Sequence, residues 1–189
     1  MAHAEYRLTL PPRTDTDDDL SVAAVLAKAK AEIGMIPNMY ANMANAPALL
    51  NTYLLGYSAF RAESGLSATE QETVLLTISR FNGCGYCMAA HSAVADMTHV
   101  PAAITDAIRD GQPIPDHRVA ALADFTLAML TSRGMPSTAA VEAFLDAGYT
   151  EQHVLHIILA IAVKTISNYS NHLFHTPVDA AFAARTWEG

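Results

Sequence analysis

The stretch SATEQETVLLTISRFNGCGYCMAAHS, residues 67–92, decides the fold of this chain. Its first four residues, 67–70, have the form of a capping box, which marks the first turn of a helix. Apolar residues then recur at helical spacings of four and three: Val74, Ile78 and Phe81. Asn82 and Gly83 end this helix, and Cys84 opens the next one. The Asn-Gly pair therefore joins two helices and is not the turn of a β-hairpin.

The rest of the chain continues in the same way, and nowhere do apolar and polar residues alternate as they would in a strand. Further helices are predicted over 20–33, over 38–45, after Pro47, over 101–110, from Val119 to a stop at Gly134, from Ser137 to Gly148, and from Thr150 to about His172. We therefore predict an all-α, single-domain helical bundle over residues 20–189. Residues 1–19 are predicted to be an N-terminal arm, because Pro11 and Pro12 block a helix and 15–19 is a solvated acidic run.

Two segments of the chain resemble each other. Placing the TEQ of residues 69–71 over the TEQ of residues 150–152 brings His91 onto His172 without a gap. The same alignment places Thr165 opposite Cys84 and Asn168 opposite Cys87. We predict a duplicated helical unit, with an active-site copy at about 66–98 and a thiol-free copy at about 147–179. A helical pattern common to both segments, without duplication, is the alternative.

The composition of the chain limits the classes of partner that it can bind. A net charge of −8 argues against nucleic acid and against an anionic membrane surface, since both need clustered Lys and Arg. Hydrophobic residues make up 51% of the chain and charged residues 16%, and this apolar surplus suggests burial between copies in a homo-oligomer. The apolar run from Ile157 to Val163 is too short to span a membrane. Without a secretion signal at the N-terminus, we expect a cytoplasmic, reducing location, where two cysteines do not form a structural disulfide.

The chain has only two cysteines, and both lie in this one stretch. On a helix, spacings of three and four place Cys84, Cys87 and His91 on one face. A thiol attacks as a thiolate, which the first turn of a helix and a neighbouring imidazole both favour. Glu72 is a candidate third member, whose pKa we expect burial to raise, as suits a proton-transfer group. Alternatively, Glu72 is an exposed acid of the first helical turn.

The pattern of Glu72, Cys84-Gly-Tyr-Cys87 and His91 resembles the alkylhydroperoxidase D family within the carboxymuconolactone decarboxylase superfamily. The likeness covers nearly the whole chain beyond about residue 20. Supporting phrases lie around the motif and at both ends of the chain: Ser79-Arg80-Phe81-Asn82-Gly83, Ala89-Ala90-His91, Ile36-Pro37-Asn38 and Asn168-Tyr-Ser-Asn171-His172. The upstream segment Ile36-Pro37-Asn38 and the downstream segment Asn168-Tyr-Ser-Asn171-His172 are similar to the peroxidase-related branch.

The resemblance implies an all-α fold of two related halves, assembled as a trimer or hexamer. It also implies an enzyme that reduces organic or hydrogen peroxide: Cys87 becomes a sulfenic acid, Cys84 condenses with it to a disulfide, and a protein or small-molecule thiol reopens the bond. His91 and Glu72 would activate the thiols. The best-studied members carry a histidine immediately before the second cysteine, where this chain has Tyr86. A relay through that histidine does not transfer to this chain.

Other functions remain open. A general disulfide oxidoreductase or thiol redox sensor would use the same cysteines, whereas a non-redox decarboxylase-like protein would not need them. A zinc site could draw on Cys84, Cys87 and His91 with Glu72 or His172, but no second ligand pair has the usual spacing. We expect neither metal nor cofactor, and for His172 a structural hydrogen bond. A thioredoxin-type fold is disfavoured because this motif follows a helix and not a strand.

Overall fold

The computed structural model describes residues 4–189 and is helical throughout, without a strand in that part of the chain, which confirms the all-α prediction. The elements are α1 (Leu20–Ile33), α2 (Asn38–Met43), α3 (Pro47–Glu63), α4 (Ala68–Phe81), α5 (Gly85–Met97), α6 (Ala102–Asp110), α7 (His117–Thr131), α8 (Thr138–Asp146), α9 (Glu151–Phe174) and the 3₁₀ helix η1 (Ala180–Arg185). The sequence patterns predicted all of these except η1.

The corner between α4 and α5 forms as its sequence requires. At the start of α4, Ser67 Oγ accepts from the Glu70 amide, and Glu70 Oε2 accepts from the Ser67 amide at 2.8 Å. At its end the chain turns through Gly83, whose φ of 66° lies in the left-handed region that glycine tolerates best. Cys84 then takes the N-cap position of α5. The two helices are thereby held at a fixed angle.

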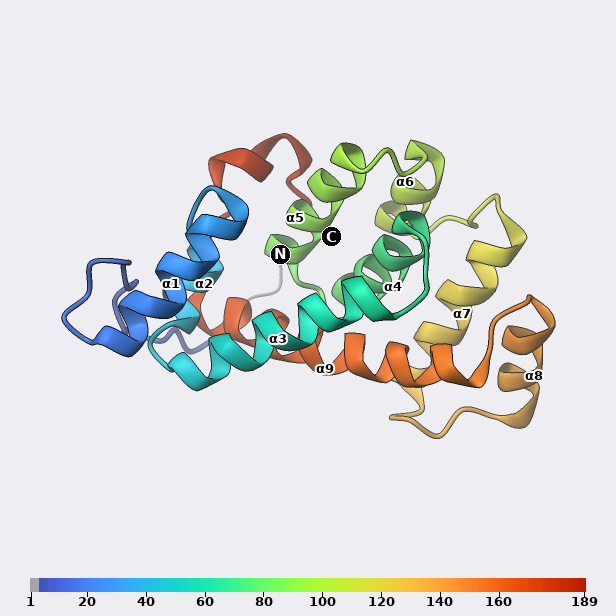
Figure 1. The fold of residues 1–189 in the computed structure, drawn as a ribbon. Coiled ribbons are helices and arrows are strands. Elements are labelled where there is room, and N and C mark those ends of the chain that lie inside the picture. Colours follow the sequence, from blue (N-terminus) through green and yellow to red (C-terminus); the bar gives the residue numbers. More distant parts are fainter. Residues whose placement is uncertain (1–3) are drawn as a thin grey trace.

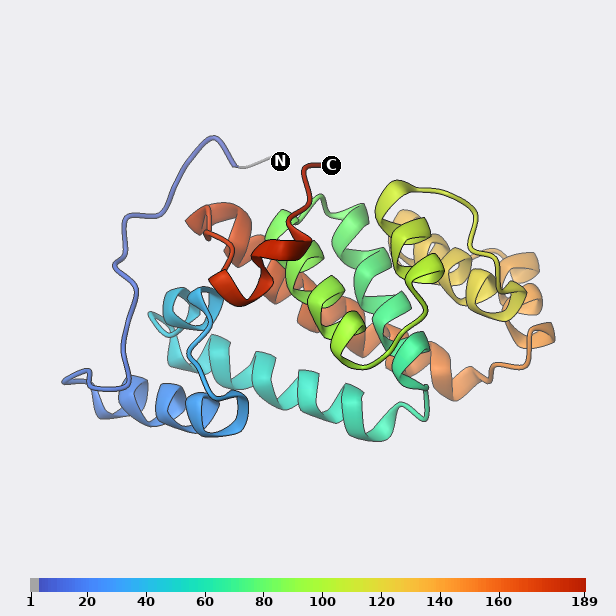
Figure 2. The same ribbon diagram turned by 90° about the horizontal axis from the view of Figure 1, so that it is seen from above.

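Helices α4 and α5 lie in the middle of the molecule, with α3 and α9 running antiparallel beneath them in Figure 1. Helices α6 and α7 flank α4 on the other side, and α1 and α2 pack at one end of the bundle (Figure 2). Helices α3 and α9 approach closely at Gly56, where a Cβ atom would lie 2.6 Å from Val163 Cγ1. This contact fixes how near α9 comes to the rest of the fold.

Both cysteines are part of a hydrophobic core. They pack in a cluster with buried side chains of α1, α2, α3 and α9, among them Leu26, Tyr40, Tyr53 and Val163. A second core lies between α4, α7, α8 and α9, and a smaller one between α4, α5 and α6. The thiols therefore lie inside the protomer and not on its surface.

The C-terminal segment packs against the helix that carries the thiols. The 3₁₀ helix η1 packs against α5, as both ribbon views show. The Tyr86 hydroxyl donates to Asp179 Oδ2 at 2.5 Å, and Asp179 also accepts from the Asn38 amide at 3.1 Å. The residue before the second cysteine thus joins α5 to the C-terminal segment and to α2.

The predicted arm is an extended segment, and its residues 1–3 lie outside the described part. Its acidic run is less free than expected, because Asp17 pairs with Arg13 and Asp19 caps α1 through the Ser21 amide. Half-buried Asp15 pairs with Lys30 at 2.7 Å. The arm is therefore tied to the helical domain.

The thiol-free segment has one structural difference from the active-site segment. Helix α9 continues without a break across Lys164 and Thr165, the positions that align with Gly83 and Cys84. No glycine is available there to adopt a left-handed turn. The duplication itself stays a prediction.

No helix within residues 4–189 has the length and apolar character required to cross a membrane.

Candidate active site

The two thiols lie at the start of α5. Cys84 is the N-cap residue and Cys87 is three residues further on, in the first helical turn. Both are free cysteines, with exposed fractions of 1% and 2%. Their side chains are hydrogen bonded to each other. Neighbouring, reduced thiols in this position are suited to forming a disulfide with each other.

Helix α9 supplies the polar groups that face the sulfurs. Asn171 Nδ2 donates to Cys87 Sγ at 3.4 Å and lies 3.9 Å from Cys84 Sγ. Ser167 Oγ lies 3.9 Å from Cys87 Sγ, and both α9 residues are buried. Since an amide N–H can only donate, Asn171 favours a negatively charged sulfur.

A second polar group of the site is the chain from His91 to Arg61. His91 Nδ1 lies 3.0 Å from Glu72 Oε2, and the other oxygen of this fully buried carboxylate pairs with Arg61 of α3. Arg61 also donates to the Tyr57 hydroxyl at 2.6 Å. An ionised carboxylate accepts only, so Nδ1 of a neutral His91 carries the proton and Nε2 is left as the basic nitrogen.

The pKa of Glu72 differs from our expectation. Burial raises its pKa, but the attraction of His91 and Arg61 and their hydrogen bonds outweigh burial and hold it below its ordinary value. The prediction of a raised pKa considered only the apolar helix face, whereas α3 brings a cation to the carboxylate. The alternative of an exposed first-turn acid is likewise wrong, because Glu72 is buried. Glu72 is therefore an anion that orients His91.

Burial also affects the histidine. It lowers the pKa of His91, and the charge of Lys164 lowers that pKa further, while Glu72 acts in the opposite direction. His91 is therefore a neutral imidazole near pH 7, able to accept a proton at Nε2.

The pKa values of the two cysteines shift in opposite directions. Burial raises the pKa of Cys87, but the hydrogen bond from Cys84 and the charge of Lys164 outweigh it and hold that pKa well below its ordinary value. The hydrogen bond to Cys87 and burial raise the pKa of Cys84 well above its ordinary value. Within the pair, Cys87 is the thiolate and Cys84 the thiol.

Lys164 is the most important residue of the site that the sequence patterns did not predict. It lies on α9 one turn before Ser167, and its exposed fraction is 0%. Its charge lowers the pKa of both cysteines, Cys84 and Cys87. The signal in the sequence was a lone lysine within an apolar helix, directly after the run from Ile157 to Val163.

Tyr86 and His172 were also named from the sequence, and both contact residues other than the cysteines. The Tyr86 hydroxyl is bound to Asp179, and the ring packs edge-on against Phe182 of η1 at 6.3 Å. The His172 ring is half-buried and stacks on Tyr169, with ring centroids 6.4 Å apart. Asn168, which aligns with Cys87, instead accepts from Asn82 at 2.8 Å and so braces the α4–α5 corner.

The geometry does not favour the zinc alternative. Within residues 4–189, no group of three or more His, Cys, Asp or Glu side chains is placed to hold a metal ion. Glu72 already has two nitrogen partners in Arg61 and His91, which leaves no free carboxylate for a tetrahedral site.

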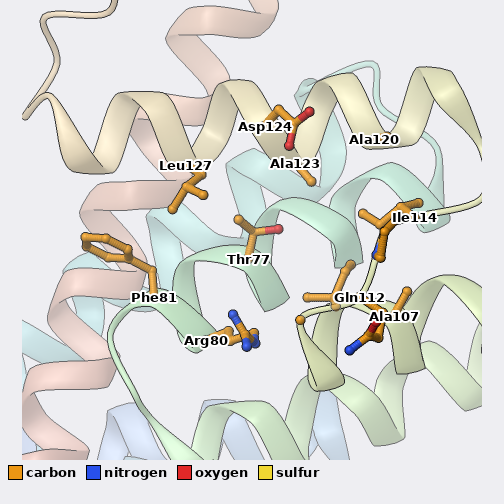
Figure 3. A pocket seen from close by; sticks show the side chains of 13 residues that line it. Thr77, Arg80, Phe81, Ala107, Gln112, Ile114, Ala120, Ala123, Asp124 and Leu127 are labelled. Atoms are coloured by element: carbon orange, nitrogen blue, oxygen red, sulfur yellow. The ribbon is translucent and has the colours of Figure 1, made fainter.

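A separate cavity of about 410 Å³ lies between α4, α6 and α7 (Figure 3). Thr77, Arg80 and Phe81 of α4 and Asp124 of α7 are among its lining residues. Neither cysteine lines it, so it is distinct from the thiol site.

Comparison with known proteins supports the resemblance noted in the sequence. The model of the carboxymuconolactone decarboxylase family matches residues 47–112, which run from α3 through the thiol motif to the end of α6. A comparison with curated proteins gave no match.

Several solved structures share the fold. A peroxidase-related protein from Silicibacter sp. TM1040 is 20% identical, with 98% of each chain covered and a TM-score of 0.78. A peroxidase-related protein with an alkylhydroperoxidase AhpD core, from Ralstonia eutropha JMP134, is 21% identical over 88% of this chain and 90% of its own, with a TM-score of 0.76. A cysteine-to-alanine variant of the debrominase Bmp8, bound to 2,3,4-tribromopyrrole, is 19% identical over 95% and 96%, with a TM-score of 0.75.

At these identities the likeness to solved structures establishes the fold and not the activity. Residues 47–112 match the model of the carboxymuconolactone decarboxylase family, and the chain has the fold of the peroxidase-related proteins with an alkylhydroperoxidase AhpD core.

Proposed function

We propose that this protein is a thiol peroxidase that reduces organic or hydrogen peroxide through Cys87 and Cys84. One observation carries the proposal: two buried, hydrogen-bonded thiols in which Cys87 has a lowered pKa and Cys84 a raised one. That asymmetry supports Cys87 as the attacking sulfur and Cys84 as the resolving sulfur. We place the reaction in a reducing compartment such as the cytoplasm, where a thiol reductant can reopen the disulfide.

In the proposed reaction the Cys87 thiolate attacks the terminal oxygen of the peroxide. The O–O bond breaks, the alkoxide takes a proton to become an alcohol, and Cys87 becomes a sulfenic acid. The Cys84 thiol then attacks the sulfenic sulfur: the S–S bond forms, the S–O bond breaks, and the leaving hydroxide departs as water with the proton of Cys84. A dithiol reductant returns both sulfurs to the thiol state by exchange.

Burial favours peroxides over proteins as oxidants. The exposed fractions of 1% and 2% admit a small molecule more readily than the disulfide of a folded protein. This weighs against a general disulfide oxidoreductase, which must dock its substrates on exposed sulfur. The electron donor has to reach the same sulfurs, so a small dithiol or a thin extended segment of a protein reductant suits the site.

Reductive debromination is a second candidate, and the structural likeness to the debrominase Bmp8 is the observation that favours it. A Cys84–Cys87 pair supplies two electrons, enough to reduce either an O–O or a carbon–bromine bond. The two candidates differ in the oxidant that forms the disulfide.

The proposal is tested by peroxide consumption with a dithiol reductant. We expect Cys87→Ser to abolish turnover and Cys84→Ser to stop it after one oxidation, leaving a sulfenic acid that a dimedone label captures on Cys87. Met97→Ser is the control for a surface sulfur, since Met97 is 74% exposed. Full turnover by Cys87→Ser would exclude this mechanism, and turnover of a bromopyrrole but not of peroxide would select the second candidate.

A further inference from the structure

Lys164 is a buried cation that no carboxylate compensates. Its exposed fraction is 0%, and no Asp or Glu side chain pairs with its Nζ in the described part of the chain. Removing an ammonium group from water is costly unless an anion compensates for it, so a lysine in this position requires an explanation. Packing alone does not give one, because a methionine would fill the same space without a charge.

The position of Lys164 on α9 identifies the anion. Ser167 and Asn171, which face Cys87 Sγ, lie three and seven residues further along the same helix. Residues at these spacings share a helix face, so Lys164 points toward the same sulfurs. Val163 beside it belongs to the core cluster that contains both cysteines.

The other charged groups around the thiols already have partners of opposite charge. Arg61 and Glu72 form an ion pair, and Glu72 also holds His91. Tyr40, Tyr53 and Tyr57 face the thiols from α2 and α3, and burial raises the pKa of each, so they are neutral. The remaining group that can carry a negative charge beside Lys164 is a cysteine sulfur.

We propose that Lys164 is the counterion of the Cys87 thiolate and the proton donor to the oxygen that leaves when the peroxide bond breaks. The first role stands on the placement of Lys164, and the second rests on the peroxidase function proposed above. In the reduced protein the ammonium and the thiolate compensate each other, and the buried site is electrically balanced.

The step balances in atoms and charge. Thiolate, peroxide and ammonium become sulfenic acid, alcohol and neutral amine, because the sulfur takes the hydroxyl of ROOH and the alkoxide takes the Lys164 proton. An alkoxide is far more basic than an amine, so this transfer is favourable. When the disulfide then forms, no thiolate remains, and a neutral Lys164 leaves no uncompensated charge in the core.

The counterion role is tested by titrating the Cys87 thiolate. Its ultraviolet absorbance is measured against pH in the reduced protein, as the difference from the matching Cys87→Ser variant. We expect Lys164→Met to raise the midpoint by about one pH unit or more, a loss of roughly tenfold or more in thiolate at neutral pH. Lys28→Met, at an exposed lysine on α1, is the matched control and keeps the wild-type midpoint.

An unchanged midpoint in folded Lys164→Met overturns the counterion role. Lys164→Gln gives the same reading should the methionine variant fail to fold, which its thermal melting curve shows. This titration requires no peroxide activity, so it decides the counterion role even if wild-type protein consumes no peroxide and the proposed function fails.

The proton-donor role is tested with Lys164→Arg, since arginine keeps the charge but does not release a proton. We expect the Cys87 midpoint to stay low while kcat/KM for peroxide falls by about a hundredfold, the usual scale of acid catalysis. A full peroxide rate in this variant overturns the donor role, and absence of peroxide reduction by wild-type protein overturns it as well.

Discussion

At the scale of single residues, one carboxylate joins three elements of the site. Glu72 of α4 binds His91 of α5 and Arg61 of α3, and it is fully buried. A buried ion is stable only with such partners, so the three side chains depend on one another. Their loss should affect folding as well as chemistry.

We expect Glu72→Gln to lower the free energy of unfolding by about 3 kcal/mol, because it leaves the Arg61 cation without its anion. Urea denaturation at neutral pH measures this. Glu63→Gln removes an exposed carboxylate of α3 and should change stability by about 0.5 kcal/mol or less. Equal stability of the two variants would mean that the buried pair contributes nothing.

The same ion pair predicts that the stability of the protein depends on pH. The pKa of Glu72 is lowered in the folded protein, so its contribution is complete above the ordinary value of 4.5 and is lost as the pH falls through the lower folded value. The stability difference between wild type and Glu72→Gln should therefore shrink below pH 4.5. Denaturation curves across the acid range check this, and a difference independent of pH would contradict it.

At the scale of elements, the approach of α3 to α9 brings the polar face of α9 to the thiols. A Cβ atom at Gly56 would lie 2.6 Å from Val163 Cγ1, and β-branched valine has little freedom to move away. Helix α9 is thus positioned by a small residue on its neighbour. The residue next to this contact is Lys164.

We expect Gly56→Ala to destabilise the protein by about 1–2 kcal/mol, since overpacking outweighs the better helix propensity of alanine. Combining it with Val163→Ala removes the opposing methyl group, so the double variant should lose about 1 kcal/mol less than the sum of the two single variants. Thermal and chemical denaturation of all four proteins form the cycle. Strict additivity would show that the two helices do not meet here.

At the scale of the whole molecule, the C-terminal segment is fastened to the active-site helix through Tyr86. The hydrogen bond to Asp179 joins residues far apart in sequence, and η1 closes over α5 as a result. The homo-oligomer of three or six copies stays a prediction, which light scattering decides against the chain mass of 20.2 kDa.

We expect Tyr86→Phe to cost about 1.5–3 kcal/mol, the range for a hydrogen bond to a charged group, and to speed hydrogen exchange over residues 176–187. Peroxide reduction should be retained, because the hydroxyl is bound to Asp179 and not to a sulfur. Tyr169→Phe, at a tyrosine that is 56% exposed, is the control. A large loss of turnover with an undisturbed C-terminal segment would instead give Tyr86 a chemical role.

The sequence by itself determined what depends on near neighbours in the chain. Caps, glycine stops and apolar spacing predicted every α-helix, and the spacing from Cys84 to His91 assigned both thiols and the imidazole to the same helical segment. These features are local, because a helix is built from residues three and four apart.

Only the tertiary structure decided which groups from distant segments meet at the sulfurs. Lys164 and Asn171 of α9, together with Arg61 of α3, reach the site through helix packing that no short-range pattern encodes. Arg61, together with His91, reverses the expected pKa shift of Glu72, and Lys164 lowers the pKa of Cys87. The physical reason is that burial and charge act through space, so the electrostatics of a buried site depend on every helix that encloses it.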